Sequence, residues 1–151
     1  MQQLFDITGT SRKVLSQFLQ NYTLDQLNTI PEGFNNNIIW NIGHIVVVQQ
    51  MLIYKLSGLP MLVSDQMVAQ YKRGTKPEAD VTQEEVDLIG SLLFETINKT
   101  ETDFNNAIFK DYQEFTVMTG FTMKNVQDAI SFNYYHEALH TGIIMGIRKF
   151  I

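Results

Sequence analysis

The chain has 151 residues, of which 44% are hydrophobic and 18% charged, and this is enough apolar material for a single domain spanning residues 1–151. Its formal net charge of −5 and its scattered basic residues argue against a nucleic-acid-binding surface. The absence of cysteine excludes disulfides and thiolate ligands. The N-terminus lacks a signal-peptide pattern, and polar side chains interrupt the most apolar stretch, residues 38–56, so we expect a cytoplasmic protein without a membrane span.

Helical periodicity appears first over residues 2–22, where side chains of an inward stripe recur at steps of three and four. The members of this stripe are Leu4, Ile7, Ser11, Val14, Leu15, Phe18 and Tyr22. A linker with Pro and Gly follows, and Asn35 or Asn36 is expected to cap a second helix that ends near Ser57. Apolar residues surround this second helix almost completely, which predicts a position at the centre of the core or in a subunit contact.

Residues 59–81 form a long connection, with a short helix expected over residues 64–71. Thr82 and Glu85 then have the spacing of a capping box, in which each side chain satisfies a backbone amide of the first helical turn. A third long helix is therefore predicted to begin at this point.

A fourth helix is expected to start near Asn125, after an irregular segment of about residues 107–123, and to continue to the end of the chain. Its expected inward residues are Val126, Ala129, Ile130, Ile143, Ile144 and Ile147. No β pattern of useful length appears, so the sequence predicts an all-α fold, a four-helix bundle with long connections after helices 1, 2 and 3. Connections of this length are expected to pack over one end of the bundle or to carry function.

Histidine occurs three times, and the three positions predict a metal site. His136 and His140 are four residues apart on the inward face of the fourth helix, and His44 lies in the middle of the second. Burying imidazoles without partners costs on the order of 1–3 kcal/mol for each unpaired polar group, whereas a divalent ion accepts one nitrogen from each neutral ring. Three nitrogen ligands leave an open coordination position, as in catalytic zinc sites. The alternative is a histidine pair that is exposed or hydrogen-bonded within the core.

The segment His136–His140 reads HEALH and matches the His-Glu-x-x-His pattern of zinc proteases. Only eleven residues follow it, and none of them is His, Glu or Asp, so the usual downstream ligand is missing. No strand is predicted that could align a peptide substrate. Glu137 lies about 100° around the helix from His136 and need not reach a metal. We interpret the match as coincidental.

Three segments resemble the DinB-like (DNA-damage-inducible) family of metal-binding four-helix bundle proteins. They are NNIIWNIGHIVVVQQMLIYKLSGLP with its W-x-x-G-H core, the loop YKRGTKP, and SFNYYHEALHTGII. The family pattern has one His in the second helix and an H-x-x-x-H pair in the last, which here correspond to His44, His136 and His140. The resemblance covers essentially the whole chain and implies a bundle of the DinB/YfiT-like type, a divalent ion (zinc, nickel or iron) at the three histidines, and a homodimer. Glutamine often follows the Gly of the last motif in the family, whereas this chain has Ile143, so substrate contacts there are expected to differ.

The resemblance also implies an activity, because some relatives are thiol S-transferases and others are isomerases or hydrolases. We expect a metal-dependent transferase that joins a low-molecular-weight thiol to an electrophilic small molecule, with the sulfur supplied by a cosubstrate because the chain has no cysteine. The alternative is a non-catalytic metal- or ligand-binding bundle, stress-related and acting as a homodimer.

Other polar side chains are candidates for supporting roles. Asn37 and Asn41 share a helix face with His44 and are expected to support its neighbours or contact substrate, with a helix-end role as the alternative. Candidates for contact with an anionic cosubstrate are Tyr71, Lys72 and Arg73, and the alternative for Lys72 and Arg73 is that they are simply solvated. Tyr134 and Tyr135 are expected to be packing residues.

Overall fold

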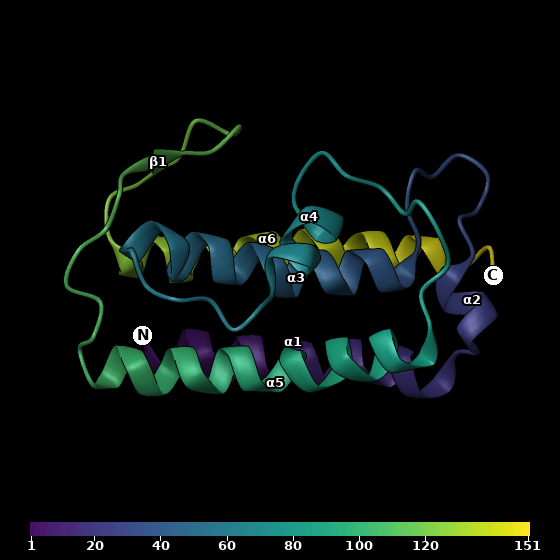
Figure 1. Ribbon diagram of the computed structural model, residues 1–151, viewed down its shortest axis with the longest axis horizontal. Helices are drawn as coiled ribbons and strands as arrows, with labels where there is room; N and C mark the ends of the chain where they lie inside the picture. The colour runs from purple at the N-terminus through teal and green to yellow at the C-terminus, as the bar shows by residue number, and fades with distance from the viewer.

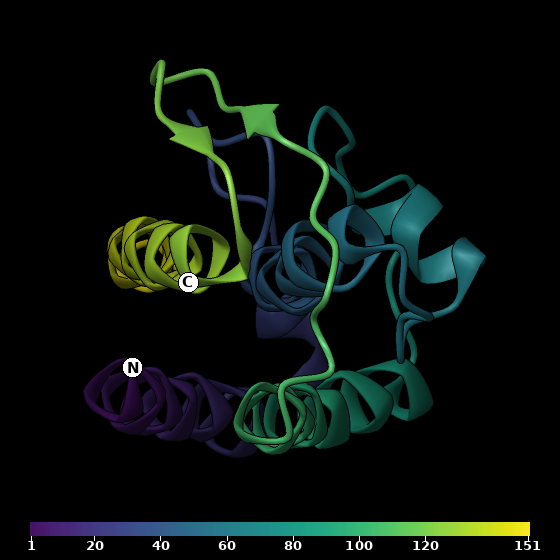
Figure 2. The same cartoon turned by 90° about the vertical axis from the view of Figure 1, so that its left-hand side faces the viewer.

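The computed structural model describes residues 1–151 and is mainly helical, which confirms the predicted all-α character. The four long helices are α1 (Gln2–Asn21), α3 (Ile38–Ile53), α5 (Gln83–Asn105) and α6 (Val126–Ile147), and they run side by side (Figure 1). Viewed from the end, α3 and α6 form one layer and α1 and α5 form the other (Figure 2). None of the helices combines the length and apolar character needed to cross a membrane.

The connections contain short elements, only some of which the sequence predicted. They are α2 (Leu24–Asn28), the 3-10 helix η1 (Lys55–Ser57), α4 (Asp65–Tyr71), and the antiparallel strands β1 (Phe115–Thr116) and β2 (Thr122–Met123). The short helix α4 matches the prediction, whereas α2 and the hairpin were missed because elements of five and two residues are too short to show periodicity. Figure 1 shows α4, the hairpin and the segment before α3 on the same side of the molecule.

Side-chain caps fix where the long helices begin. Thr82 and Glu85 form the predicted capping box of α5, and Asn125 caps α6 by accepting from the backbone N–H of Asp128. The cap of α3 is Asn37, whose Oδ1 accepts from the Trp40 N–H at 2.8 Å, so the expectation of Asn35 or Asn36 was wrong. At its other end, α6 stops at residue 147 and does not continue to the terminus.

Helix α3 is the centre of the core, as its all-round apolar character predicts. Its side chains at Ile39, Ile42, Ile45 and Val46 are fully buried. Helix α3 packs against two other long helices, α6 and α5, and against the short helix α4. Burying a Val or Ile side chain stabilises a fold by about 1.5–3 kcal/mol, so this one helix accounts for a large share of the hydrophobic driving force.

Two predicted inward stripes are partly wrong. In α1 the buried side chains include Phe5, Thr8 and Arg12, whereas Ile7 of the predicted stripe is 38% exposed. In α6 the side chain of Ile143 is 37% exposed. Both errors have the same origin, because a buried ion pair between α1 and α6 turns polar side chains inward where hydrophobic periodicity expects apolar ones.

Candidate metal centre

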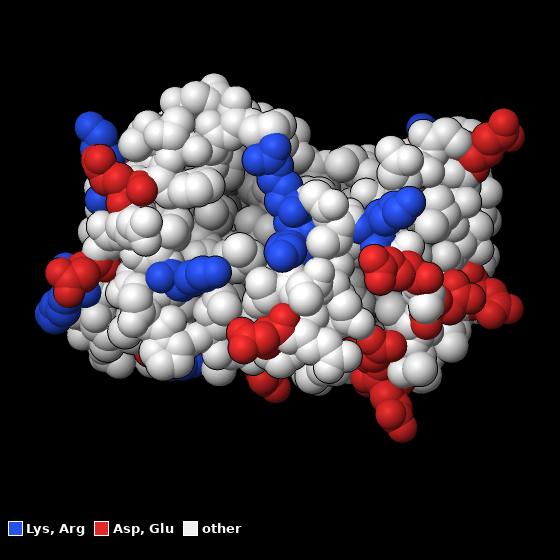
Figure 3. All heavy atoms as spheres, turned by 45° about the horizontal axis from the view of Figure 1, so that its top comes forward, with Lys and Arg blue, Asp and Glu red and all other residues white.

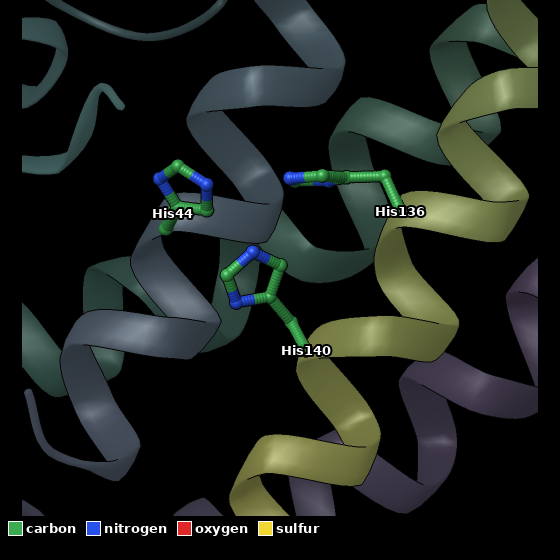
Figure 4. Close-up of side chains that lie close together, drawn as sticks. All are labelled: His44, His136 and His140. Atoms are coloured by element: carbon green, nitrogen blue, oxygen red, sulfur yellow. The ribbon is translucent and has the colours of Figure 1, made fainter. Parts of the chain in front are cut away.

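The three histidines converge between α3 and α6. The ring centroid of His44 lies 5.1 Å from that of His136 and 4.5 Å from that of His140, and the two α6 rings are 4.6 Å apart. One nitrogen from each ring can be chosen so that all three lie within 4.8 Å of one another. Figure 4 shows the rings pointing toward a common space from the two helices. The sequence prediction that distant parts of the chain bring these imidazoles together is confirmed.

Hydrogen bonds fix the tautomers of two of these rings. His44 Nδ1 lies 2.6 Å from the backbone oxygen of Tyr71, and since a carbonyl only accepts, Nδ1 carries the proton. His140 Nδ1 lies 2.8 Å from Asn41 Oδ1. The amide nitrogen of Asn41 donates to Asn36 Oδ1 and to the Asn37 carbonyl, at 2.9 and 2.7 Å, which fixes the orientation of the amide with its oxygen toward the ring. In both rings Nε2 therefore keeps its lone pair, as a metal ligand requires.

His136 differs from the other two rings, because its Nδ1 is buried and has no hydrogen-bond partner. One turn earlier on α6, Asn133 Oδ1 is also buried without a partner. The His136 ring stacks loosely against Phe132, with 6.5 Å between centroids. An unpaired buried nitrogen costs on the order of 1–3 kcal/mol, and a cation bound at this nitrogen would remove that cost.

Electrostatics keep all three rings neutral near pH 7. Burial is the largest cause in each case, and it lowers the pKa of His44, with the hydrogen bond to Tyr71 acting in the opposite direction. Burial and the two neighbouring rings lower the pKa of His136 to about 3, and burial and the His44 ring lower the pKa of His140 to about 4. Neutral imidazoles present lone pairs, so no proton has to be displaced from the ligand nitrogens before an ion binds at neutral pH.

The W-x-x-G-H motif has a local structural explanation. The Trp40 indole stacks on the His44 ring at 4.8 Å and 16°, and its Nε1 donates to the Gln70 carbonyl at 3.2 Å. A Cβ on Gly43 would lie 2.6 Å from carbons of the Tyr71 ring. The missing side chain at Gly43 therefore lets α4 approach closely enough for the Tyr71 carbonyl to hold His44.

Gly43→Ala is expected to lower the unfolding free energy by about 1–3 kcal/mol, because the added methyl group overpacks the contact with the buried Tyr71 ring. Urea denaturation measures this loss. The matched control is Gly9→Ala, because a Cβ there meets nothing within 4 Å and Ala is favoured over Gly inside a helix by about 1 kcal/mol. Equal effects of the two substitutions would contradict the close-approach role of Gly43.

The two asparagine candidates have different roles. Asn41, which is fully buried, bonds directly to His140, whereas Asn37 does not reach a histidine and instead caps α3 and donates to the Asn28 carbonyl at 2.9 Å. Lys72 and Arg73 are exposed, and Arg73 contacts the sulfur of Met118 at the hairpin. Of the sequence candidates beyond the histidines, only Asn41 and the Tyr71 carbonyl touch the cluster.

Asn41→Ala is expected to weaken divalent-metal binding by about 10–100-fold, since it removes the acceptor that orients His140. Competition with a chromophoric chelator measures the affinity. Asn37→Ser, which preserves a capping oxygen, is the control and should leave the affinity within a few-fold of the original. A similar loss in both variants would show that the effect comes from helix stability and not from the bond to His140.

Sequence reasoning missed the partner of Glu137. Arg12 forms a two-point ion pair with it, Nη2 to Oε1 at 2.7 Å and Nε to Oε2 at 3.1 Å, and both side chains are essentially fully buried. Arg12 Nη1 also donates to the Leu93 carbonyl and Thr96 Oγ1, and Asn133 donates to Glu137 Oε1 at 2.7 Å. Both oxygens of the Glu137 carboxylate are therefore bonded to Arg12 of α1. This agrees with the interpretation that the match to the protease pattern is coincidental. The sequence offered one sign of this pair: Arg12 has helical spacing from Thr8 and Leu15 and so shares their face of α1.

Comparisons with known proteins bear on the fold and the family of the chain. A solved structure, described as the conserved protein of locus from Enterococcus faecalis, has 14% sequence identity and a TM-score of 0.69, over 99% of this chain and 95% of the other. At that identity the match supports the fold alone. No curated protein matched the chain. The profile of the DinB superfamily matches residues 8–144, which include all three histidines, and the chain belongs to the DinB superfamily.

Proposed function

We propose that the four long helices form a DinB-type bundle whose function is to bind one divalent ion, zinc, nickel or iron, through His44, His136 and His140. The observation that carries the proposal is the convergence of three neutral imidazoles whose ligand atoms lie within 4.8 Å. Two of them have Nδ1 held by fixed acceptors, the Tyr71 carbonyl and Asn41. Pre-oriented rings lose little freedom on binding an ion, so such a cluster favours high affinity.

We further propose that the bound ion serves transfer of a low-molecular-weight thiol to an electrophilic small molecule. When bound by three histidines, a divalent ion acts as a Lewis acid and lowers the pKa of a thiol or water at its open position. The chain contributes no sulfur nucleophile of its own, so the thiol has to be a cosubstrate. His136 and His140 are partly exposed, which leaves the cluster accessible from one side.

One observation favours a non-catalytic metal- or ligand-binding protein as the second candidate. Glu137, the carboxylate nearest in sequence to the paired histidines, has both oxygens bonded to Arg12 and is 1% exposed. It is therefore not free to accept a proton from a substrate, and general acid–base catalysis needs a side chain within hydrogen-bond reach.

Metal analysis of the purified protein tests the binding proposal. About one ion per chain is expected in the wild type. His44→Ala and His136→Ala are expected to lose the bound ion. Ser131→Ala, a change on the exposed face of α6, is the control that should keep its ion. The proposal fails if the His variants retain the wild-type metal content. Conjugation of cellular thiols to a model electrophile, compared between wild type and His136→Ala, then separates an enzyme from a binding protein.

We also propose that the protein is a homodimer. On α6, the side chains of Tyr135, Leu139 and Ile143 recur every four residues and are 47%, 48% and 37% exposed. An apolar stripe of this kind is typical of a surface that a partner covers. Sedimentation equilibrium of the wild type and of Leu139→Lys tests the proposal, with a dimer expected for the former and dissociation for the latter.

A further inference from the structure

A cavity of about 370 Å³ lies beside the metal centre but outside the space that the three rings share. Its walls come from α3 with Trp40, from the end of α4 with Tyr71, from the segment 75–81, and from the first turn of α5 with Glu85. The volume falls in the range of small-molecule sites, about 300–1,000 Å³. Nothing in the proposed thiol chemistry uses this space.

The lining of the cavity is acidic. Glu78, Asp80 and Glu85 contribute carboxylates, and Lys76 is the single basic residue among the lining residues. None of these four groups belongs to an ion pair, because the two salt bridges of the chain are Arg12–Glu137 and Lys99–Asp103. Figure 3 shows acidic side chains outnumbering basic ones at the right-hand end of the face it displays. The field in this cavity therefore favours a positively charged occupant.

The hydroxyl of Tyr71 is a second, independent sign of a ligand. The residue is 3% exposed and lines the cavity, and its ring is held against Gly43, so the side chain has little freedom to turn away. Burial and the negative charge of Glu85 raise the pKa of Tyr71 to about 12, and no hydrogen bond to the chain contributes. The hydroxyl has no hydrogen-bond partner within the chain and is not among the fully buried polar atoms, so a ligand in the cavity can reach it.

Other polar groups around the cavity already have partners within the chain. The Asn37 amide is engaged by Trp40 and by Asn28, and the Gln70 carbonyl accepts from Trp40 and from Thr75. Glu85 uses one carboxylate oxygen to accept from the Thr82 N–H at 3.0 Å, which leaves its second oxygen available. The groups that remain for a ligand are mainly acceptors and an aromatic wall, with Lys76 as the one free cation, and this set suits a cation with N–H donors.

We propose that this cavity binds a small organic cation, an alkylammonium or alkylguanidinium, through the Glu85 carboxylate and the Tyr71 hydroxyl, with the apolar part of the ligand against Trp40. The site requires no metal. Two of its lining residues also contact the metal centre, Trp40, which stacks on His44, and Tyr71, whose carbonyl bonds His44.

Trp40 is the only tryptophan, so intrinsic fluorescence reports on this cavity directly. Metal-free protein, kept in chelator so that the test is separate from the metal-binding proposal, is titrated with n-butylammonium and with n-butylguanidinium. A saturable change is expected with at least one of these cations. Binding of 1-butanol and of butyrate is expected to be at least about tenfold weaker, because neither offers a charge-assisted donor to Glu85.

Three variants locate the effect. Glu85→Gln, which still accepts from Thr82, is expected to weaken cation binding about tenfold or more, and Tyr71→Phe about fivefold. Glu84→Gln removes the same charge from the same helical turn outside the cavity lining and should stay within about twofold of wild type. The proposal is overturned if neither cation gives a saturable signal, if 1-butanol binds equally well, or if the Glu84 and Glu85 variants lose affinity equally. Thermal unfolding of each variant verifies that it is folded.

Discussion

Arg12→Met is expected to lower the unfolding free energy by about 3–5 kcal/mol, because it leaves the Glu137 carboxylate charged, buried and without its main partner. The guanidinium makes two contacts with that carboxylate and two more with α5, and it is fully buried. Urea denaturation followed by circular dichroism measures the loss. The pair Lys99–Asp103 supplies the control, because its lysine side chain is 45% exposed and the buried Asp103 keeps a hydrogen bond from Tyr54: Lys99→Met should cost less than about 1 kcal/mol.

A double variant separates the ion pair from simple packing. Arg12→Met combined with Glu137→Met removes both charges, and a buried pair replaced by apolar side chains is often neutral or stabilising. The double variant is therefore expected to be more stable than Arg12→Met alone. If the double variant loses as much as the two single variants added together, the two side chains do not interact energetically. Glu137 lies between His136 and His140 on α6, so the pair also fixes the rotation of the helix that presents both rings.

The histidine cluster could be predicted from the sequence because its spacing has a direct geometric meaning. Residues 136 and 140 share a helix face by the period of 3.6, and the apolar surroundings of His44 place it in the core. The spacing could not predict which groups accept the hydrogen bonds of the histidine rings. The acceptor for His44 is the backbone carbonyl of Tyr71 on α4. Every residue has such a carbonyl, so the side chain at this position gave no sign of the contact.

Two of the incorrect predictions have one physical cause, which is that tertiary pairing outweighs local pattern. Hydrophobic periodicity assigned Ile7 to the core of α1, whereas the ion pair with α6 brings Arg12 inward and leaves Ile7 38% exposed. The cap of α3 is Asn37 rather than its two Asn neighbours, since the amide of Asn37 is also held by the Asn28 carbonyl. Three consecutive asparagines are equivalent as capping residues, and their other hydrogen bonds distinguish them: Asn37 donates to the Asn28 carbonyl of α2, whereas Asn36 Oδ1 accepts from the Asn41 amide.

The metal-free protein is expected to lose stability as the pH falls from about 6.5 toward 4. In the unfolded chain a histidine titrates near 6.5, whereas in the fold the pKa of His136 is about 3 and that of His140 about 4. Between these values the unfolded chain binds more protons than the folded one, so the unfolding free energy decreases on acidification. Each affected ring contributes a slope of up to about 1.4 kcal/mol per pH unit, and this contribution is absent above pH 7, where both states are neutral.

His136→Gln isolates this effect from the titration of carboxylates, which is common to both proteins. Urea unfolding in the presence of chelator, at intervals from pH 7 to pH 4.5, should give a slope against pH that is shallower in the variant by about 1.4 kcal/mol per pH unit below pH 6. Parallel curves for the two proteins would mean that His136 is protonated at the same pH in the folded and unfolded states. That result would place its ring in solvent and contradict the closed cluster. Excess zinc in the wild type should instead move the loss to lower pH, because a ring nitrogen that binds an ion cannot take a proton.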